Sequence, residues 1–436
     1  MDQSAVIRLF IDWGFTRLKL WICDGEGTLL CEQSTYTATL AKRPAFYDSR
    51  DLDQVCMIIG RALHSCLPAK IIHVYTSSQM HALAGSLNGH SDFVSTWNDL
   101  PIQPATADSV LVKDGIPVLN SMPVNKVIHD DQALLLSSSS CSRSQESLNA
   151  ITSLSSPIGL LLHRIFQVPV PCSRSWWQST CLPSDYLALG SLDQTCYLSE
   201  SPLYIQPSYA RRLLGIDSLI VIYPEVGDLQ ALTYSSVRQC QVMLNLGTGS
   251  QVILPSLSVS EAMPYFRYYI HALPAIPTLS HVPCGRLLAD YVTAKNISFS
   301  ILRQAMDELT PAHLVSNCQR ISKTLLCFSG FSFHDCNYHQ HPTTTLSELA
   351  SLNPDVFLSL WVFQYYRIID HFLLPLLGTT DFVTINIVGD LGGLADSFSA
   401  LLFALLPPQF QLCRLAALTL PCSLLQFHVD SAPAAC

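Results

Sequence analysis

The sequence predicts an α/β protein of two domains built on one plan, and three observations support this prediction. The chain has 436 residues, a length that exceeds one ordinary hydrophobic core. Stretches with strand-like alternation are interleaved with stretches of helical periodicity. An apolar strand, a glycine bend and a second apolar strand occur at residues 6–22, and the same shape returns at residues 240–257. A shape that repeats near the middle of a chain indicates two halves with a common topology.

The first half is expected to begin with a sheet. Residues 6–34 contain three apolar runs separated by a glycine bend and by the turn at residues 24–27, which predicts a three-stranded antiparallel meander. Residues 51–67 carry apolar side chains at helical spacing, and residues 70–78 form a strand that ends in small polar residues. A further strand is expected within residues 217–228, where it leads to an acid.

The second half is expected to alternate in the same way. Helical segments are predicted near residues 286–307 and 345–377, followed by a strand at 381–390 and an apolar helix at 394–406. The richest apolar run, residues 356–377, contains charged residues in its second half, whereas a membrane span needs about 20 apolar residues with few charges. We therefore expect this run to be a buried helix, and no membrane partner is predicted.

Composition narrows the function classes. The net charge is −9 and Lys plus Arg total 24, without a basic stripe, so nucleic acid is not an expected partner. The amino terminus lacks a basic start followed by a long apolar core, and the 16 cysteines are scattered without a C-x-x-C pair. These features predict a cytoplasmic protein with reduced thiols. The oligomeric state stays open, with a homodimer as one alternative.

Three glycine bends follow apolar strands and share one design. They are residues 12–16 with Asp12, Gly14 and Thr16, residues 247–250 with Gly247, Thr248 and Gly249, and residues 389–393 with Gly389, Gly392 and Gly393. Glycine permits positive φ and close approach of a ligand to the backbone, and exposed N–H and hydroxyl groups hold phosphate oxygens. A local hairpin explains any one bend, but three bends spread over both halves favour a phosphate site.

Two other nucleotide-binding patterns fit the sequence less well. The P-loop pattern G-x-x-x-x-G-K-[ST] does not occur. A Rossmann pattern begins at Gly247, but Val252 occupies its third glycine position and the residues that follow predict a strand rather than a helix. An NAD-dependent enzyme is therefore an alternative without further support in the chain.

Two acids stand at the ends of predicted strands. Asp12 ends the first strand, from where its carboxylate could reach a bound Mg²⁺ through water. Asp228, in "PEVGDLQA", follows a strand and a glycine, and a carboxylate placed there suits deprotonation of a sugar hydroxyl that attacks phosphorus. Taken alone, each acid is also consistent with a helix cap or a solvated loop.

Two neighbouring segments have the composition of a ligand site. The stretch "YTSSQMHAL" runs from a strand into Gln79, Met80 and His81, and "STWNDLP" follows with Trp97 and Asp99. An aromatic side chain with polar neighbours makes a suitable wall for a polyhydroxylated ligand. By contrast, "FHDCNYHQH" at residues 333–341 lacks a second pair of zinc ligands, so a surface loop is favoured there over a metal site.

In combination these segments resemble the FGGY carbohydrate kinases, especially their xylulokinase and sedoheptulokinase members. "SSQMHAL" is similar to the S-G-Q-M-H-G segment of that family, and "IDWGFTRLK" and "LNLGTGSQV" to its first and second phosphate motifs. "VGDLQA" is similar to the catalytic G-D-[NQ]-x-A segment, and "IVGDLGGLADS" occupies the place of the adenosine motif. "TWND", "SDYLALG" and "VPCGRLLADYV" resemble further family segments, and all of them occur in family order over nearly the whole chain.

The resemblance implies a two-domain actin-like fold, in which a ribonuclease-H-like unit is duplicated. Each unit would have a mixed five-stranded sheet with helices on both faces. An N-terminal domain over residues 1–238 would bind sugar and supply the catalytic base, and a C-terminal domain over residues 239–436 would bind ATP. The implied activity is ATP-dependent phosphorylation of a ketose hydroxyl, with a sugar and ATP·Mg²⁺ as small-molecule partners.

The resemblance also implies a role for each matched residue. Asp228 would be the general base and Asp12 would lie near metal and phosphate; Gln79, Met80, His81 and Asp99 would line the sugar pocket; Gly14, Thr16, Lys19, Gly247, Thr248 and Gly249 match the phosphate motifs; and Gly389, Gly392 and Gly393 match the adenosine motif.

Several positions depart from the family pattern. Phe15 stands where the family usually has threonine, Ser78 replaces a glycine, and "SGFSFHD" lacks the acid and the arginine of the G-E-R-H-D segment that it resembles. These departures leave open the alternative of a catalytically degenerate, kinase-like binding or scaffold protein.

Overall fold

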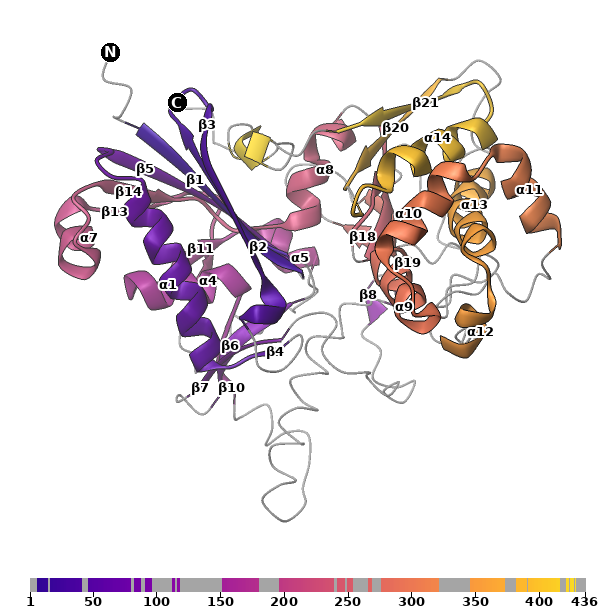
Figure 1. Ribbon diagram of the computed structural model, residues 1–436. Helices are drawn as coiled ribbons and strands as arrows, with labels where there is room; N and C mark the ends of the chain where they lie inside the picture. The colour runs from indigo at the N-terminus through magenta and orange to yellow at the C-terminus, as the bar shows by residue number, and fades with distance from the viewer. Residues whose placement is uncertain are drawn as a thin grey trace. The chain divides into compact units, whose positions relative to one another are not determined.

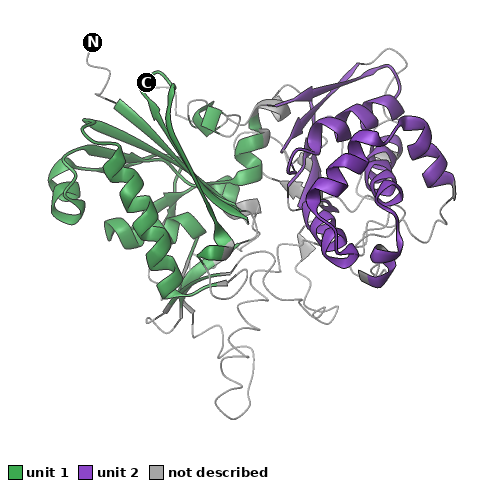
Figure 2. Cartoon of the chain, in the orientation of Figure 1, with its two compact units in different colours: residues 1–234, 268–275, 418–436 green, residues 235–267, 276–417 purple. Residues whose placement is uncertain are grey.

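The computed structural model of the chain (Figure 1) divides into two compact units (Figure 2). Unit 1 comprises Met1–Tyr234, Tyr268–Ala275 and Leu418–Cys436, and unit 2 comprises Ser235–Arg267 and Ile276–Ala417. The structure describes residues 6–14, 16–40, 46–79, 82–87, 91–95, 112–113, 116–117, 151–179, 196–238, 241–247, 249–253, 266–268, 276–320, 346–372, 382–389, 391–415, 421–422, 424–426 and 428.

Unit 1 is built around a mixed sheet with the order β13-β14-β5-β1-β2-β3, in which β15 also pairs with β5. Its strands are β1 (Val6–Trp13), β2 (Arg17–Asp24), β3 (Leu29–Tyr36), β5 (Ile71–Ser78), β13 (Leu203–Ile205), β14 (Leu219–Ile222) and β15 (Val226–Gly227). The predicted antiparallel meander β1-β2-β3 is confirmed, and β5 and β14 add to β1 in parallel.

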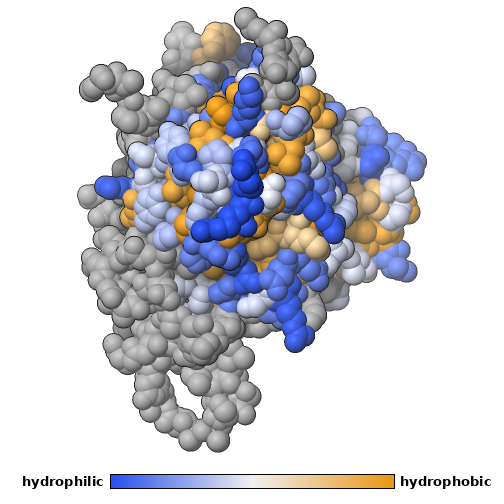
Figure 3. All heavy atoms as spheres, turned by 90° about the vertical axis from the view of Figure 1, so that its left-hand side faces the viewer, coloured by the Kyte–Doolittle hydropathy of each residue, from blue (hydrophilic) through white to orange (hydrophobic). Residues whose placement is uncertain are grey.

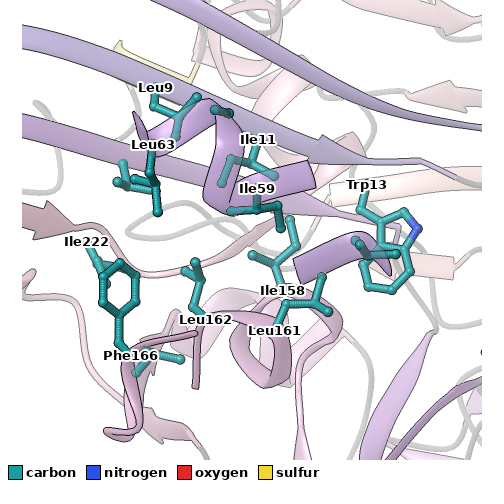
Figure 4. Packing of buried hydrophobic residues seen from close by; sticks show 14 of the residues in the cluster. Leu9, Ile11, Trp13, Ile59, Leu63, Ile158, Leu161, Leu162, Phe166 and Ile222 are labelled. Carbon is teal, nitrogen blue, oxygen red and sulfur yellow. The ribbon is translucent and has the colours of Figure 1, made fainter. Parts of the chain in front are cut away.

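One face of this sheet packs on two helices to form the core of unit 1. Alternate residues of β1, such as Leu9 and Ile11, contact side chains of α1 (Ser49–Ser65) and α4 (Pro157–Phe166), including Ile59 and Leu161 (Figure 4). All four side chains are fully buried or nearly so, and each contributes about 1.5–3 kcal/mol of hydrophobic stabilisation. Helix α1 begins after Asp48, whose carboxylate accepts hydrogen bonds from the first turn.

The opposite face of the sheet carries an aromatic stack. The rings of Phe10 and Tyr75 lie 5.0 Å apart, and those of Tyr75 and Tyr223 lie 4.3 Å apart. His428, from the C-terminal part of the chain, packs over both tyrosines. Burial lowers the pKa of His428 to about 3, so this imidazole is neutral at physiological pH. Residues from both ends of the chain therefore complete unit 1.

Smaller elements extend unit 1 beyond this sheet. They are α5 (Arg174–Ser179), α7 (Pro207–Leu214), the 3-10 turn at Thr37–Thr39, a four-stranded sheet of β4 (Phe46–Tyr47), β6 (Leu83–Leu87), β7 (Ser91–Ser95) and β10 (Ile151–Ser155), the pair β11 (Val170–Cys172) and β12 (Cys196–Leu198), and the pair β8 (Val112–Lys113) and β9 (Ile116–Pro117).

Unit 2 is built around a sheet with the order β18-β19-β17-β16-β20-β21. Its strands are β16 (Val242–Asn245), β17 (Gly249–Ile253), β18 (Phe266–Tyr268), β19 (Ile276–Pro283), β20 (Val383–Val388) and β21 (Phe410–Arg414). Strands β16, β17 and β19 pair antiparallel, whereas β20 and β21 add in parallel.

The helices of unit 2 are α9 (Gly285–Lys295), α10 (Phe299–Glu308), α11 (Pro311–Arg320), α12 (Leu346–Ser351), α13 (Pro354–Phe372) and α14 (Ala395–Leu405). Helix α13 is the apolar run that was expected to be buried, and its Trp361 and Tyr365 contact Phe398 of α14 at 4.9 Å and 5.1 Å between ring centroids. None of the helices in the described parts of the chain is both long and apolar enough to cross a membrane.

The two sheets share one five-strand order. Strands β3-β2-β1-β5-β14 of unit 1 correspond to β19-β17-β16-β20-β21 of unit 2, with the same sequence order, three antiparallel strands and two parallel ones. The repeat that the sequence predicted is therefore a repeat of topology. Each sheet exceeds the expected five strands, because the edge strands β13 and β18 and the short β15 add to the shared set.

The surface that Figure 3 shows has hydrophobic residues interspersed with hydrophilic ones. Large apolar side chains that are exposed in the described residues include Leu30, Tyr204 and Phe382, at 56%, 57% and 85% of their full exposure. Scattered apolar side chains of this kind are normal on globular proteins, and the homodimer stays a prediction.

Candidate functional site

Three strands of unit 1 end at the same edge of its sheet. In the parallel register, Asp12 of β1 lies beside Ser77 of β5, and Val226 of β15 lies on the other side of Ser77. One step further along, the backbone N–H of Gln79 donates to the carbonyl of Trp13 at 3.0 Å. Residues from three distant parts of the sequence therefore meet at the carboxyl ends of parallel strands, where ligands of α/β proteins commonly bind.

Asp12 is a buried carboxylate at this edge. Its side chain is 5% exposed, and the Ser77 hydroxyl donates a hydrogen bond to its Oδ1 at 2.9 Å. Burial raises the pKa of Asp12, while the positive charge of Lys19, which faces it across the β1–β2 pair, and the bond from Ser77 act in the opposite direction. The predicted residues Asp12 and Lys19 are thus brought together.

Gln79 follows β5 and is 2% exposed. Neither its amide nitrogen nor its amide oxygen has a hydrogen-bond partner in the part of the chain that the structure describes. A buried amide without partners is unfavourable by about 1–3 kcal/mol. The predicted role of Gln79 in the sugar pocket stays a prediction.

Asp228 is the first residue of α8 (Asp228–Arg238) and follows β15 directly. Because Gly227 lies beside Ser78 in the sheet, Asp228 is placed at the level of Gln79. Its carboxylate is half-buried, and its Oδ1 accepts a hydrogen bond from the N–H of Leu229 at 2.7 Å. The N-terminus of a helix is a favourable place for a carboxylate, because the helix dipole attracts negative charge there.

The tip of the β1–β2 hairpin is closed by a hydrogen bond from the N–H of Gly14 to the carbonyl of Arg17 at 3.0 Å. Gly14 does not adopt positive φ, and a Cβ at this position would meet only ordinary contacts. Gly14 thus does not use the positive φ that glycine permits, and its role in a phosphate site stays a prediction. Thr16 is exposed at the same tip.

The corresponding edge of unit 2 brings two glycine bends together. The N–H of Leu246, which follows β16, donates to the carbonyl of Val388 at 2.8 Å. Gly389 has φ +100°, and a Cβ added to it would lie 2.1 Å from the carbonyl oxygen of Leu246. This contact requires glycine, because no side chain fits between the two backbones. Gly247 then leads into β17, which begins at Gly249.

Two arginines hold the second of these bends. Arg414 donates to the carbonyl oxygen of Gly389 at 2.6 Å and Arg303 donates to that of Gly392. Gly392 and Gly393 have φ of +69° and +89°, a region that favours glycine. The backbone at Gly389, Gly392 and Gly393 thus depends on glycine and is held by two arginines, and its role in binding nucleotide stays a prediction.

The fold is that of known carbohydrate kinases. No protein-family model and no curated protein sequence matches the chain. Among solved structures, the chain is similar to xylulose kinase from Lactobacillus acidophilus with a TM-score of 0.66 at 15% identity, over 98% of this chain and 89% of that one. Similar values hold for xylulose kinase from Rhodospirillum rubrum, with a TM-score of 0.63, 12% identity and coverage of 99% and 91%. The chain is also similar to Plasmodium falciparum glycerol kinase with ADP, with a TM-score of 0.62 at 10% identity, over 99% of this chain and 91% of that one.

The chain has the two-domain sugar-kinase fold. The predicted fold class is thereby confirmed. At these identities the likeness shows the fold alone, so the predicted domain boundary between residues 238 and 239, the roles of the site residues and the closeness to sedoheptulokinases stay predictions. The structure does not match the Rossmann alternative, because a Rossmann motif needs a helix after the glycine bend, whereas the bend at Gly247 leads into strand β17.

Four predicted site residues, Met80, His81, Asp99 and Thr248, lie outside the described residues. The structure also points to one residue without a predicted role. Glu225 is 1% exposed, three positions before Asp228, and its carboxylate lies at the N-terminus of α4. In the sequence it stands between a proline and a valine like an ordinary turn acid, and only the packing of α4 distinguishes it.

Asp12 offers a suitable ligand for Mg²⁺. A hard cation prefers carboxylate oxygens, and a positive charge at this buried carboxylate would offset its desolvation. No group of three or more His, Cys, Asp or Glu side chains with metal-ligating geometry occurs among the described residues. Mg²⁺ usually takes several of its ligands from water and from substrate phosphates, so one carboxylate such as that of Asp12 is compatible with its binding.

Proposed function

We propose that the protein is an ATP-dependent kinase that phosphorylates a hydroxyl group of a sugar, with a ketose such as xylulose or sedoheptulose as the first candidate. The observation that carries this proposal is the meeting of Asp12, Gln79 and Asp228 at one sheet edge of a sugar-kinase fold. The resemblance of the surrounding motifs to FGGY kinases supports the same chemistry.

Asp228 is proposed as the general base. Its carboxylate would accept the proton of the sugar hydroxyl as that oxygen attacks the terminal phosphorus atom of ATP. Gln79 would hold a neighbouring sugar hydroxyl through the two amide atoms that lack partners among the described residues. Asp12, held by Ser77, would orient the metal ion. Together these side chains fix which hydroxyl faces the base.

The bends of unit 2 are proposed to hold the nucleotide. Gly247 and Gly249 would present backbone N–H groups to phosphate oxygens, and Gly392 and Gly393 would leave room for the adenosine. ATP·Mg²⁺ supplies the phosphoryl group and the charge that stabilises its transfer. The role of residues 1–238 in sugar binding and of residues 239–436 in nucleotide binding follows from this proposal, as does the use of Mg²⁺.

The proposal is tested by ligand titration with turnover as the second readout. ATP·Mg²⁺ and a panel of ketoses, aldoses and polyols should each raise the melting temperature, and ATP should be consumed only when the right sugar is present. Binding of ATP without turnover for any sugar would instead favour the degenerate, kinase-like binding protein. Stabilisation by NAD and not by ATP would overturn the kinase proposal altogether.

A further inference from the structure

We propose that Glu225 is a positioning residue for Asp228, because its buried carboxylate fastens the segment that carries Asp228 to the N-terminus of α4. This inference rests on the proposed role of Asp228 as the base. It concerns a residue that makes no contact with substrate and acts through the backbone that it holds.

The carboxylate of Glu225 is fully engaged with α4. Its Oε2 accepts hydrogen bonds from the Ser156 hydroxyl and from the N–H of Gly159 at 2.7 Å, and its Oε1 accepts one from the N–H of Ile158 at 3.3 Å. A Cβ at Gly159 would lie 2.4 Å from the Ser156 hydroxyl oxygen, so any larger residue here would displace that side chain. No lysine or arginine pairs with Glu225 among the described residues, so its carboxyl is held by the α4 N-terminus and these donors.

Capping of α4 does not require this buried acid. Ser156 already occupies the N-cap position, and its hydroxyl oxygen accepts from the N–H of Gly159 at 3.2 Å. A serine cap of this kind supplies about 1 kcal/mol by itself. Burial raises the pKa of Glu225, which means that its charged form is held at a free-energy penalty. The added carboxylate therefore contributes a tertiary link, which a local cap cannot provide.

The backbone of Glu225 and the residues after it continue the link towards the base. Its N–H donates to Pro171 and its carbonyl accepts from Ser173, which fixes it to β11. The next two residues form β15 and pair with β5. Asp228 follows at once, so no unpaired residue separates the anchored acid from the base.

Gln230 holds the other side of Asp228. This side chain is 1% exposed; its Oε1 accepts from the N–H of Gly227 at 2.9 Å and its Nε2 donates to the carbonyl of Ser175 at 2.8 Å. Two buried polar side chains thus fix the backbone directly before and after the half-buried carboxylate of Asp228. The base would be held in place without being buried itself.

The experiment compares E225Q with D48N in the full chain. Both variants turn a carboxylate at a helix N-terminus of unit 1 into an amide, but Asp48 caps α1 and belongs to a different segment. We expect E225Q to lower kcat about tenfold to a hundredfold with KM for ATP within about twofold, because a displaced base loses alignment but not nucleotide binding. D48N should leave kcat within about twofold of the wild type, because asparagine caps a helix about as well as aspartate.

Amide hydrogen exchange provides the second readout. In E225Q, residues 226–230 should exchange at least about tenfold faster than in D48N, since the lost anchor opens this segment locally. An E225Q enzyme that matches D48N in kcat, or unchanged exchange at residues 226–230, would overturn the inference. If the wild type turns over no sugar, the proposed function fails, and the exchange measurement alone then decides whether Glu225 anchors the segment.

Discussion

The close approach at Gly389 allows a substitution whose effect can be worked out from the structure. In G389A the new Cβ would lie 2.1 Å from the oxygen and 2.8 Å from the carbon of the Leu246 carbonyl. Both atoms belong to backbone, so no side chain can swing aside. The alanine is accommodated only if the end of β20 and the residues after β16 move apart.

The expected loss of unfolding free energy in G389A has two contributions. A non-glycine residue at φ +100° is strained by about 1–3 kcal/mol. Separation of the strand ends also breaks the bond from the N–H of Leu246 to Val388, which adds about 1 kcal/mol or more. We therefore expect G389A to lower the free energy of unfolding of unit 2 by about 2–4 kcal/mol. Because the moved backbone is part of the proposed phosphate site, affinity for ATP·Mg²⁺ should fall at least about tenfold.

Substitutions of two other glycines serve as controls that separate the effect of backbone strain from that of the steric clash. Gly215 also has positive φ, +69°, but a Cβ there would meet nothing within 4 Å, so G215A measures backbone strain alone, about 1–2 kcal/mol. Gly60 lies inside α1 with open space around it, and G60A should stabilise the protein by about 0.5–1 kcal/mol. Urea denaturation measures all three variants, and hydrogen exchange of β16 and β20 gives a local readout for G389A. A loss in G389A no larger than that in G215A would refute the steric reasoning.

Three further substitutions test the residues at the edge of unit 1. D228N should lower turnover more than about a hundredfold with little change in ATP affinity, measured by steady-state kinetics and calorimetry, and near-normal turnover would remove Asp228 from the role of base. D12N should change the pH dependence of the free energy of unfolding. Because folding raises the pKa of Asp12, protonation of this carboxyl stabilises the folded protein, fully so below pH 3.8, the pKa of Asp12 in the unfolded chain. This contribution is lost as the pH rises through the pKa of Asp12 in the folded protein. Without Mg²⁺, D12N should thus lose less unfolding free energy than the wild type between about pH 4 and about pH 7 in urea titrations, and parallel curves would contradict the burial effect. Q79L should leave the melting temperature unchanged or raise it, because it removes a buried amide without partners among the described residues, while KM for the sugar rises about tenfold or more; an unchanged KM would exclude Gln79 from the sugar site.

Local features of the fold could be predicted from the sequence because short-range patterns determine them. The alternation of β1, β2 and β3, with glycine and acid at the turns, is enough to predict a meander. The helical spacing of residues 51–67 similarly predicts α1 within a few residues of its observed bounds. The repeat of strand, bend and strand even indicated the shared topology of the two units.

The long-range part of the site follows from pairings that no local pattern records. Asp12 and Asp228 come to the same edge of the sheet because β1 and β15 both add to β5, which depends on crossovers through α1, α4 and the elements between them. Glu225 could not be recognised from its neighbours, since its partner is the N-terminus of a helix that begins 68 residues earlier, at Pro157. A sequence pattern also does not distinguish Gly14, which lacks positive φ, from Gly389, whose backbone is constrained by Leu246, a residue far away in the sequence.

The transfer of a labelled phosphoryl group from ATP tests the central claim most directly. ATP with ¹⁸O in its terminal phosphoryl group is incubated with Mg²⁺, a panel of ketoses and either the wild-type protein or D228N. The masses of the sugar products are then measured by mass spectrometry. The wild type should produce a singly phosphorylated ketose that carries the label, and D228N should produce at least about a hundredfold less of it. Label found only in inorganic phosphate, or equal yields of sugar phosphate from both proteins, would contradict it.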